Sequence, residues 1–385
     1  MYLKFQADHI YSDGKLWDKN FVLVTDPNGR VEGIVPVAGA GEGIRYTPGV
    51  ITPGHINCHC HLELSYMHGA IPEATGLTRF VAAVMKTSPA DTETQLTAME
   101  AAAKEMRKAG IVAVADISNH GLSLQPKIHS QLYWHNFLEI SNLDDDRAPG
   151  KLETFRQLQA RFRMHFPQTV LTPHAIYSVS PETFRLINQY TAGEAITIHN
   201  QECLAEDELM TYGTGKFLPF YESIGRTHLP VTVAGKSSLQ TWLPYFNNGQ
   251  TILLVHNTFT SETDILFALD YAAANGLQLY FCLCPNANMY IEQSLPPVDK
   301  LIQHGCKVVL GTDSYASNWQ LNIAKEAAMV KQHFPSIPDT TLLEWMTGSG
   351  ASALGIQQQF GIFKKGAQPG VVLVQPDFSA SEKLI

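Results

Sequence analysis

Strand-like and helix-like segments alternate along most of this 385-residue chain, and this alternation limits its possible folds more than any other feature. Apolar segments typical of strands occupy residues 50–61, 111–117, 131–140, 170–176, 195–199, 251–256, 277–284 and 307–311. Segments with a helical pattern lie between them, at residues 76–85, 93–109, 151–166, 181–190, 262–274 and 298–304. Strands that alternate with helices form parallel sheets, and eight such strands favour an α/β fold of the (β/α)8 TIM-barrel type over an open doubly wound sheet.

The two ends of the chain have a different character. Short apolar segments at the N-terminal end, with the turn signal Asp26-Pro27-Asn28-Gly29 between two of them, predict strands and a hairpin. A similar apolar segment, Val371–Val374, lies near the C-terminal end. We therefore predict one small β-sandwich domain built by both termini, from residues 1–50 and 357–385, around a barrel domain over residues 51–356.

Composition excludes several classes of protein. The chain carries 27 Lys and Arg against 36 Asp and Glu, a net charge of −9 that argues against binding to nucleic acid. The sequence contains no run of about 18 apolar residues, so it predicts no membrane helix. The N-terminal residues lack the basic and apolar pattern of a secretory signal, so we expect a cytoplasmic protein. Its six cysteines form no CxxC pair, which indicates reduced thiols and no structural zinc site.

Potential metal ligands recur at the ends of the predicted strands, where barrel enzymes carry their active sites. These residues are His59, His61, His174, His199, Glu202, His256 and Asp313. Successive side chains of a strand point to opposite faces, so His59 and His61 share one face while Cys58 and Cys60 share the other. The joint pattern predicts a metal centre, whereas a single histidine at a strand end would more often be structural.

The residue types indicate the chemistry of this centre. Three imidazoles and one carboxylate, from His59, His61, His199 and Asp313, can hold one zinc or ferrous ion and leave a position for water. Such an ion lowers the pKa of bound water and produces hydroxide near neutral pH. Glu202 suits a general acid/base, and His256 can hydrogen-bond the attacking hydroxide. The fourth predicted strand carries no lysine that would bridge two ions, which favours one metal.

Six motifs follow one another along the chain: Pro53-Gly-His-Ile-Asn57 leading into His59-Cys-His61-Leu-Glu-Leu-Ser65, Thr172-Pro-His174-Ala-Ile-Tyr177-Ser-Val-Ser-Pro181, His199-Asn-Gln-Glu202, Leu254-Val-His256-Asn257, Cys284-Pro-Asn-Ala-Asn288 and Gly311-Thr-Asp313-Ser-Tyr-Ala-Ser-Asn318. In these motifs the sequence resembles the amidohydrolase superfamily, in particular its branch of cytosine/adenosine-deaminase-like and chlorohydrolase-like members. The variant after His61 and the motif around Asp313 look closest to the bacterial aminodeoxyfutalosine deaminases. Departures occur at Ala287, where Ser is more usual, at Trp319, and in the C-terminal Gly366-Ala-Gln-Pro-Gly370.

The resemblance implies a single zinc or iron ion on His59, His61, His199 and Asp313. It also implies that Glu202 shuttles protons, that His256 positions the water and that His174 contacts a substrate heterocycle. A homodimer is a further expectation from the resemblance.

We therefore predict a metal-dependent enzyme that deaminates an amino-substituted heterocycle by hydrolysis, such as aminodeoxyfutalosine or another adenine nucleoside. Glu202, His256 and Asp313 are the predicted catalytic residues. The same site would also serve hydrolysis of a cyclic amide or dechlorination of a triazine, and a non-catalytic scaffold is a remote alternative. Small heterocycles, and neither nucleic acids nor membranes, are the expected partners.

Several further residues have two interpretations each. Arg79 can pair with a substrate carboxylate or lie on the surface, and Trp319 can stack on a flat ring or pack at the rim. Glu63 can orient a ligand imidazole or form an ion pair at the strand end. For Asp116 and Glu139, near the ends of the second and third predicted strands, we expect structural hydrogen bonds.

Overall fold

Two four-stranded parallel sheets make up the centre of the molecule, in a computed structural model that describes residues 2–385. Their strand orders are β11-β10-β9-β8 and β12-β13-β14-β15. The bounds are β8 His55–Cys60, β9 Ile111–Ser118, β10 Tyr133–Ile140, β11 Thr169–Pro173, β12 Ala195–Asn200, β13 Thr251–His256, β14 Gln278–Leu283 and β15 Val308–Leu310. The prediction of a mixed α/β fold with parallel strands is confirmed.

Backbone hydrogen bonds join the edges of these two sheets. The His59 carbonyl on β8 accepts from the N–H groups of Thr312 at 2.9 Å and Asp313 at 3.0 Å, just after β15. At the other pair of edges, the His174 carbonyl after β11 accepts from the His199 N–H on β12 at 2.9 Å. These bonds involve the same residues that carry the predicted metal ligands, so the meeting of the two sheets places those ligands.

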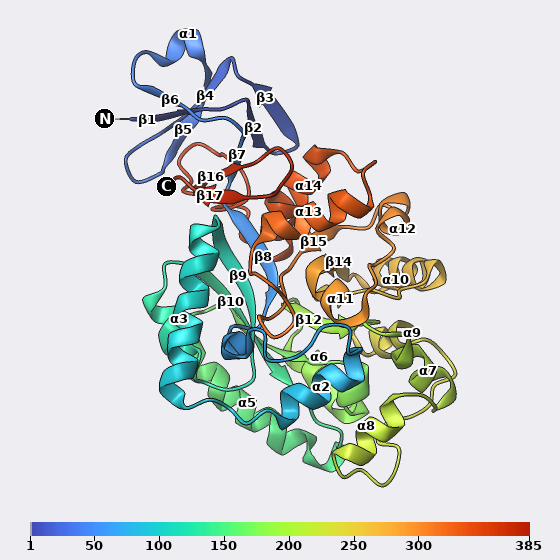
Figure 1. Ribbon diagram of the computed structural model, residues 1–385. Helices are drawn as coiled ribbons and strands as arrows, with labels where there is room; N and C mark the ends of the chain where they lie inside the picture. Colours follow the sequence, from blue (N-terminus) through green and yellow to red (C-terminus); the bar gives the residue numbers. More distant parts are fainter. Residues whose placement is uncertain (1) are drawn as a thin grey trace.

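Helices surround the two parallel sheets (Figure 1). Their bounds are α2 Leu77–Lys86, α3 Thr92–Lys108, α4 Leu124–His129, α5 Ala148–Arg163, α6 Pro181–Tyr190, α10 Glu262–Asn275, α11 Pro285–Glu292, α12 Val298–Gln303, α13 Ile323–His333, α14 Asp339–Met346 and α15 Gly348–Ala353. The start of α6 is fixed locally, because the Ser180 hydroxyl accepts from the Thr183 N–H and Pro181 occupies the first turn.

The long connection between β12 and β13 contains further short helices. They are α7 Leu204–Tyr212, α8 Phe217–Ser223 and α9 Ser238–Trp242. A carboxylate from α7, Glu206, accepts from the Glu202 N–H at 2.7 Å and from the Ser238 hydroxyl at 3.0 Å. These bonds connect the inserted helices to the chain directly after His199. Within residues 2–385, no helix is long and apolar enough to span a membrane.

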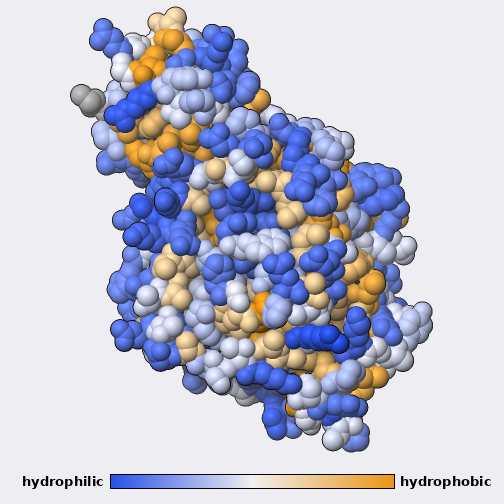
Figure 2. Space-filling view, in the orientation of Figure 1, coloured by the Kyte–Doolittle hydropathy of each residue, from blue (hydrophilic) through white to orange (hydrophobic). Residues whose placement is uncertain are grey.

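Both ends of the chain contribute strands to two further sheets, whose orders are β5-β4-β1-β6 and β17-β16-β7-β2-β3. The bounds are β1 Leu3–Gln6, β2 His9–Ser12, β3 Lys15–Asp18, β4 Phe21–Thr25, β5 Val31–Pro36, β6 Ile44–Tyr46, β7 Val50–Pro53, β16 Val371–Val374 and β17 Ser381–Lys383, with the short helix α1 Val37–Ala40 before β6. The two termini lie close together (Figure 1). A separate apolar cluster fills this region, with Phe5, Ile10, Leu23, Ile51, Val371 and Leu373 among its members. Figure 2 shows a mainly hydrophilic face, with apolar residues gathered over these terminal sheets.

One predicted strand is wrong in its extent. Residues 50–61 form two strands, and β7 pairs with β16 in a terminal sheet while β8 belongs to the central sheet. The chain changes sheets at Gly54, where a Cβ atom would overlap the Val112 side chain and lie 2.5 Å from the Pro369 carbonyl oxygen. Only glycine fits this crossing, so the continuous apolar pattern hides a break in the strand.

Candidate active site

Three of the predicted ligands meet where β8 and the segment after β15 come together. His61 Nε2 lies 3.1 Å from His59 Nε2. Asp313 Oδ1 lies 3.5 Å from His59 Nε2 and 3.4 Å from His61 Nε2. All three side chains are buried, so their nitrogen and oxygen atoms surround one small volume shielded from solvent.

His199 and His256 complete the cluster from β12 and β13. Their rings stack with centroids 5.2 Å apart, and the His59 ring centroid lies 5.0 Å from that of His199. Glu202 Oε2 is 3.5 Å from His256 Nε2 and 3.9 Å from His199 Nδ1. The structure therefore brings together all six residues predicted as ligands or as catalytic groups.

The donor set fits a divalent cation. Ligand atoms of His59, His61 and His199 lie within 4.8 Å of one another, and so do those of His59, His256 and Asp313. His199 Nδ1 lies 3.1 Å from His256 Nε2, on the side of the cluster, whereas His199 Nε2 lies 3.3 Å from the Glu139 carboxylate. Imidazoles with one carboxylate suit zinc or ferrous iron.

The protonation states favour ligation. Burial lowers the pKa of His61 to about 3 and also lowers the pKa values of His59 and His256, which keeps these imidazoles neutral. Burial alone would raise the pKa of Asp313, but His59 and His61 outweigh it and hold that pKa well below its usual range. Neutral imidazoles and an ionised carboxylate are the forms that bind metals. His199 differs, because the Glu139 carboxylate outweighs the effect of burial and raises the pKa of His199 to about 9, so metal binding there must displace a proton.

Glu202 is in the opposite protonation state to Asp313. Burial raises the pKa of its carboxyl well above the usual range, and the charges of neighbouring carboxylates raise it further. A protonated Glu202 can therefore donate to a group in the cavity, which is the role of a general acid.

The backbone at this site adopts conformations that side chains usually avoid. His256 has a φ of 74° and Asp313 a φ of 57°, both in the left-handed region. Each such residue costs roughly 1–3 kcal/mol. Asp313 is held there because its N–H bonds to the His59 carbonyl at 3.0 Å and because the Ser317 hydroxyl donates to its Oδ2 at 2.5 Å.

Two asparagines of the sequence motifs, Asn288 and Asn318, hold residues of the site in position. Asn288 Nδ2 lies 3.3 Å from His256 Nδ1 and donates to Thr258 Oγ1 at 2.7 Å, so it orients the imidazole. Asn318 Nδ2 donates to the Thr312 carbonyl at 2.7 Å, directly before Asp313, and to Glu326 Oε1 at 2.9 Å.

Sequence reasoning missed Glu326 on α13. Its buried carboxylate also accepts from the backbone N–H and the side-chain amide of Asn286, both at 2.9 Å. It therefore ties the loop after β14 to the loop after β15. Its spacing from Ile323 and Val330 could have indicated a buried position, because all three residues share the apolar face of the helix.

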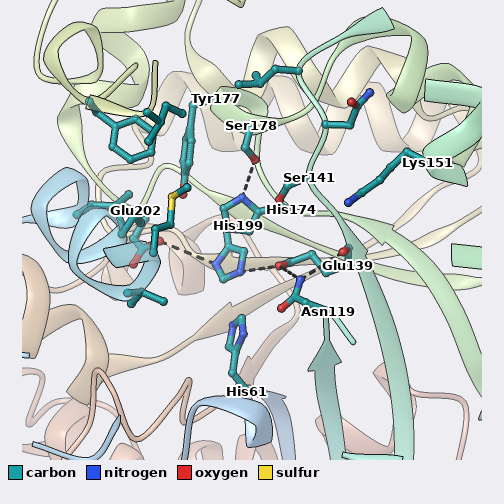
Figure 3. Close-up of a pocket in the computed structure, with 18 of the residues that line it drawn as sticks. His61, Asn119, Glu139, Ser141, Lys151, His174, Tyr177, Ser178, His199 and Glu202 are labelled. Atoms are coloured by element: carbon teal, nitrogen blue, oxygen red, sulfur yellow. Dashed lines mark hydrogen bonds and ion pairs between the residues drawn. The ribbon is translucent and has the colours of Figure 1, made fainter. Parts of the chain in front are cut away.

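A cavity of about 890 Å³ opens above the cluster. Its floor includes His61, His199, Glu202, His256 and Asp313, and His174 lines it as predicted. His174 Nδ1 is 2.6 Å from the Ser178 hydroxyl, which fixes the ring beside His199 (Figure 3). The lining also contains apolar side chains, among them Leu64, Leu77, Phe80, Val81, Val84, Met85, Leu143, Tyr177, Phe220 and Ile224, and polar side chains, among them Asn119, Glu139, Ser141, Asp144, Arg147 and Lys151.

The structure does not bring Arg79 or Trp319 into this cavity. On α2, Phe80 and Val84 face the cavity, whereas Arg79 lies on another side of the helix and lines a separate cavity with Lys216. Trp319 is 39% exposed, and its Nε1 donates to Glu73 Oε1 at 2.8 Å. The direction of Arg79 depends on how helix α2 is rotated, and the direction of Trp319 depends on the turn of its loop. Neither can be read from the residues next to them in the sequence.

Two further carboxylates lie near the site. Of the two interpretations of Glu63, the structure shows the ion pair: its Oε1 lies 3.2 Å from His120 Nδ1, and its oxygens also accept from the Asn119 N–H and the Ser123 hydroxyl, both at 2.9 Å. Glu139, for which we expected only structural bonds, lines the cavity with its Oε1 atom 3.3 Å from His199 Nε2. The signal for Glu139 was a carboxylate near the end of an almost completely buried strand.

Known proteins share this fold and sequence pattern. The sequence is 25% identical over 369 residues to a 5-methylthioadenosine/S-adenosylhomocysteine deaminase of Teredinibacter turnerae, covering 90% of this chain and 77% of that protein. The structure resembles an aminofutalosine deaminase of Helicobacter pylori in complex with methylthio-coformycin, with a TM-score of 0.82, 18% identity and coverage of 99% of this chain and 97% of that one. It also resembles an adenosine deaminase from Xanthomonas campestris with bound zinc, with a TM-score of 0.73, 18% identity and coverage of 99% and 89%. The model of the amidohydrolase family matches residues 50–383. The family resemblance predicted from the motifs is thus confirmed, and the chain belongs to the amidohydrolase family.

Proposed function

We propose that this protein deaminates adenine nucleosides by hydrolysis. The observation that carries the proposal is that Glu202 and His256 meet the proposed ligands His61, His199 and Asp313 in the lining of one cavity, with His59 buried directly beside them. Relatives and structural neighbours named as deaminases of adenosine derivatives support it. The family match gives the chemistry as hydrolysis, and these names narrow it to deamination.

The proposed centre holds one zinc or ferrous ion on His59, His61, His199 and Asp313. When bound, such an ion supplies Lewis-acid activation of water. The neighbour with bound zinc supports zinc, whereas the ligand set suits either metal. Elemental analysis of the purified protein would identify the ion, and a content near two ions per chain would contradict the single site.

The protein's own residues move the protons. Water adds to the ring carbon that bears the amino group, and Glu202 donates its proton to the adjacent ring nitrogen. His256 and Asp313 accept one proton from the attacking water and return it to the amino group, which leaves as ammonia when the carbon–nitrogen bond breaks. The new hydroxyl group becomes a carbonyl and gives its remaining proton to Glu202. General acid/base assistance of this kind contributes roughly 10²–10⁴-fold.

The cavity supports a nucleoside rather than a free base. Its volume of about 890 Å³ lies near the upper end of the common range for small-molecule sites, roughly 300–1,000 Å³. Beside a ring near His199, the lining offers polar side chains to a sugar and apolar side chains, such as Phe80, Val84 and Met85, to an apolar substituent. His174, beside His199, would contact the heterocycle.

We also propose that the two parallel sheets form one (β/α)8 barrel and that the terminal sheets form a separate β-sandwich domain. The bonds from Thr312 to His59 and from His199 to His174, which join both pairs of edges, support the barrel. An experimental structure in which either pair of edges is apart would contradict it.

Ammonia release by metal-loaded protein tests the proposed reaction. The substrates would be aminodeoxyfutalosine, adenosine, methylthioadenosine, S-adenosylhomocysteine, guanine and cytosine. We expect release from at least one adenine nucleoside and none from the free pyrimidine base. If one metal ion is bound per chain and no compound releases ammonia, the proposed reaction is wrong, and hydrolysis of a cyclic amide becomes the next reaction to assay.

A further inference from the structure

Glu206 is a completely buried carboxylate of helix α7 that the proposed reaction does not use. Its Oε1 accepts from the Glu202 N–H at 2.7 Å. Its Oε2 accepts from the Gln201 N–H at 3.1 Å and from the Ser238 hydroxyl at 3.0 Å. The two backbone bonds therefore hold the short segment that leads from the proposed ligand His199 to the proposed general acid.

The capping of α7 does not by itself explain these bonds. A glutamate in the first turn of a helix commonly accepts from the N–H of the capping residue, which is Cys203 in α7. That bond is present, but at 3.4 Å it is the longest that the carboxylate accepts. The shorter bonds come from N–H groups that precede the capping residue, so Glu206 holds a segment that a helix cap would leave free.

The segment that Glu206 holds has a strained backbone. Gln201 has a φ of 45°, in the left-handed region that residues other than glycine rarely adopt. Its carbonyl accepts from the Phe259 N–H at 3.0 Å, and its side-chain amide donates to Asp264 Oδ2 at 2.9 Å. Such a conformation persists only where the surrounding contacts enforce it, and the N–H of Gln201 is enforced by Glu206.

The turn at Gln201 sets the direction of Glu202. The Glu202 carboxyl points toward His199 (Figure 3), and its Oε2 lies 3.5 Å from His256 Nε2. Among residues 2–385, the bond to Glu206 is the only hydrogen bond that the Glu202 N–H donates. A displacement of about 1 Å in a reacting group can cost roughly 10²-fold in rate, so the placement of this carboxyl matters for kcat.

We propose that Glu206 is a positioning residue, which enforces the turn at Gln201 and thereby aims the Glu202 carboxyl at the reacting groups. This role rests on the proposed deaminase function, because Glu206 acts through Glu202. Glu206 is not part of the cavity lining, so it transfers no proton itself.

The variant Glu206→Gln tests this role, with Glu208→Gln as a matched control. The amide keeps the shape of the side chain, but its NH2 group cannot accept, so one of the two backbone N–H groups loses its partner. Glu208 is an exposed residue of the same helix that accepts only from the Thr214 hydroxyl, at 3.2 Å. For the nucleoside that the wild type deaminates fastest, we expect kcat per bound zinc ion to fall roughly 10- to 100-fold in Glu206→Gln, with KM within about twofold and wild-type values in the control.

A double-mutant cycle with Glu202→Gln separates positioning from structural support. If Glu206 acts through Glu202, Glu206→Gln should lower kcat by less than about threefold in the Glu202→Gln background. An equal loss in both backgrounds would overturn the proposal, and so would a variant that loses stability in urea while kcat per bound zinc ion stays at the wild-type value. If Glu206→Gln does not fold, Ser238→Ala replaces it, because it removes one bond to the carboxylate. We then expect a smaller fall in kcat that also disappears in the Glu202→Gln background, and an unchanged kcat would overturn the proposal.

Crystal structures keep this test separate from the proposed reaction. If the wild type releases no ammonia from any nucleoside, the deaminase function is wrong, and the structures of wild type and Glu206→Gln are compared. We expect Gln201 to leave the left-handed region in the variant and Glu202 Oε2 to move by about 1 Å or more away from His256 Nε2. This movement would support the positioning role although the reaction is wrong. An unchanged φ of Gln201 with an unchanged Glu202 carboxyl would overturn that role.

Discussion

Lys127 Nζ lies 2.6 Å from Asp116 Oδ2 in the interior of the protein, and both side chains are completely buried. The other carboxylate oxygen of Asp116 accepts from the Leu62 N–H at 2.8 Å, directly after the ligand His61. Lys127 also donates to Ser118 Oγ at 2.8 Å, so its ammonium has several oxygen partners. This buried pair fixes the backbone that carries one of the proposed metal ligands.

Replacing Lys127 with Met should destabilise the protein by about 3–5 kcal/mol, because Asp116 would remain as a buried carboxylate without its cation. Urea unfolding monitored by circular dichroism measures the loss. Lys300→Met is a matched control, because Lys300 forms an exposed ion pair with Glu262 at 3.1 Å, and such pairs contribute about 0–1 kcal/mol. Similar losses for both variants would argue against a structural role for the buried pair.

Removal of a proposed ligand should abolish metal binding. We expect His61→Ala and Asp313→Ala to retain almost no zinc after dialysis, because each removes one donor from a set of four. His228→Ala, at an exposed position, should keep the wild-type content. Mass spectrometry of the metal content gives the result without any assay of activity. Full zinc occupancy in both ligand variants would mean that the ion binds elsewhere.

Glu202→Gln should keep the metal and lose turnover. The amide preserves the shape of the side chain but cannot donate and accept a proton as a carboxyl group does. We expect kcat to fall by roughly 10²–10⁴-fold with unchanged zinc content. Steady-state ammonia release measures kcat, and a fall smaller than fivefold would remove Glu202 from the proton transfers.

Trp319→Ala should change kcat/KM less than threefold. The side chain is exposed, and its nitrogen bonds to Glu73 rather than to any group of the cavity. The same assay as for Glu202 measures this effect. A large rise in KM would instead show that the loop folds over the bound substrate and that stacking on the ring takes place.

Glu326 should make stability depend on pH. Burial raises its pKa to about 8 in the folded chain, from an ordinary value of 4.5. The folded chain therefore binds more protons than the unfolded chain between these values. The contribution of Glu326 to the free energy of unfolding is largest below pH 4.5 and falls as the pH rises to about 8.

The variant Glu326→Gln removes this titration. We expect the stability of wild type relative to the variant to decrease from pH 5.5 to pH 8.5, by an amount of a few kcal/mol, since one pKa unit corresponds to about 1.4 kcal/mol. Urea unfolding of both proteins at the two pH values measures the difference. A constant difference would mean that the Glu326 carboxyl does not titrate in this range.

The strands of the two parallel sheets could be predicted from the sequence because apolar runs are a local property. The predicted segment 195–199 corresponds to β12, and 251–256 matches β13. The proposed ligands could be predicted for the same reason, since the period of two places His59 and His61 on one face of β8. The break in the strand at Gly54 could not be predicted, because it depends on the approach of Pro369 from the far end of the chain.

The sequence by itself determined most strands of the two parallel sheets and the side chains at their ends, because periodicity and ligand chemistry are properties of neighbouring residues. Only the tertiary structure decided what those side chains meet. Glu139 is bonded by Asn119, which directly follows β9, and Glu326 joins two loops because α13 packs across them. Such contacts connect residues far apart in the chain, and their formation depends on how whole elements pack, which no local pattern encodes.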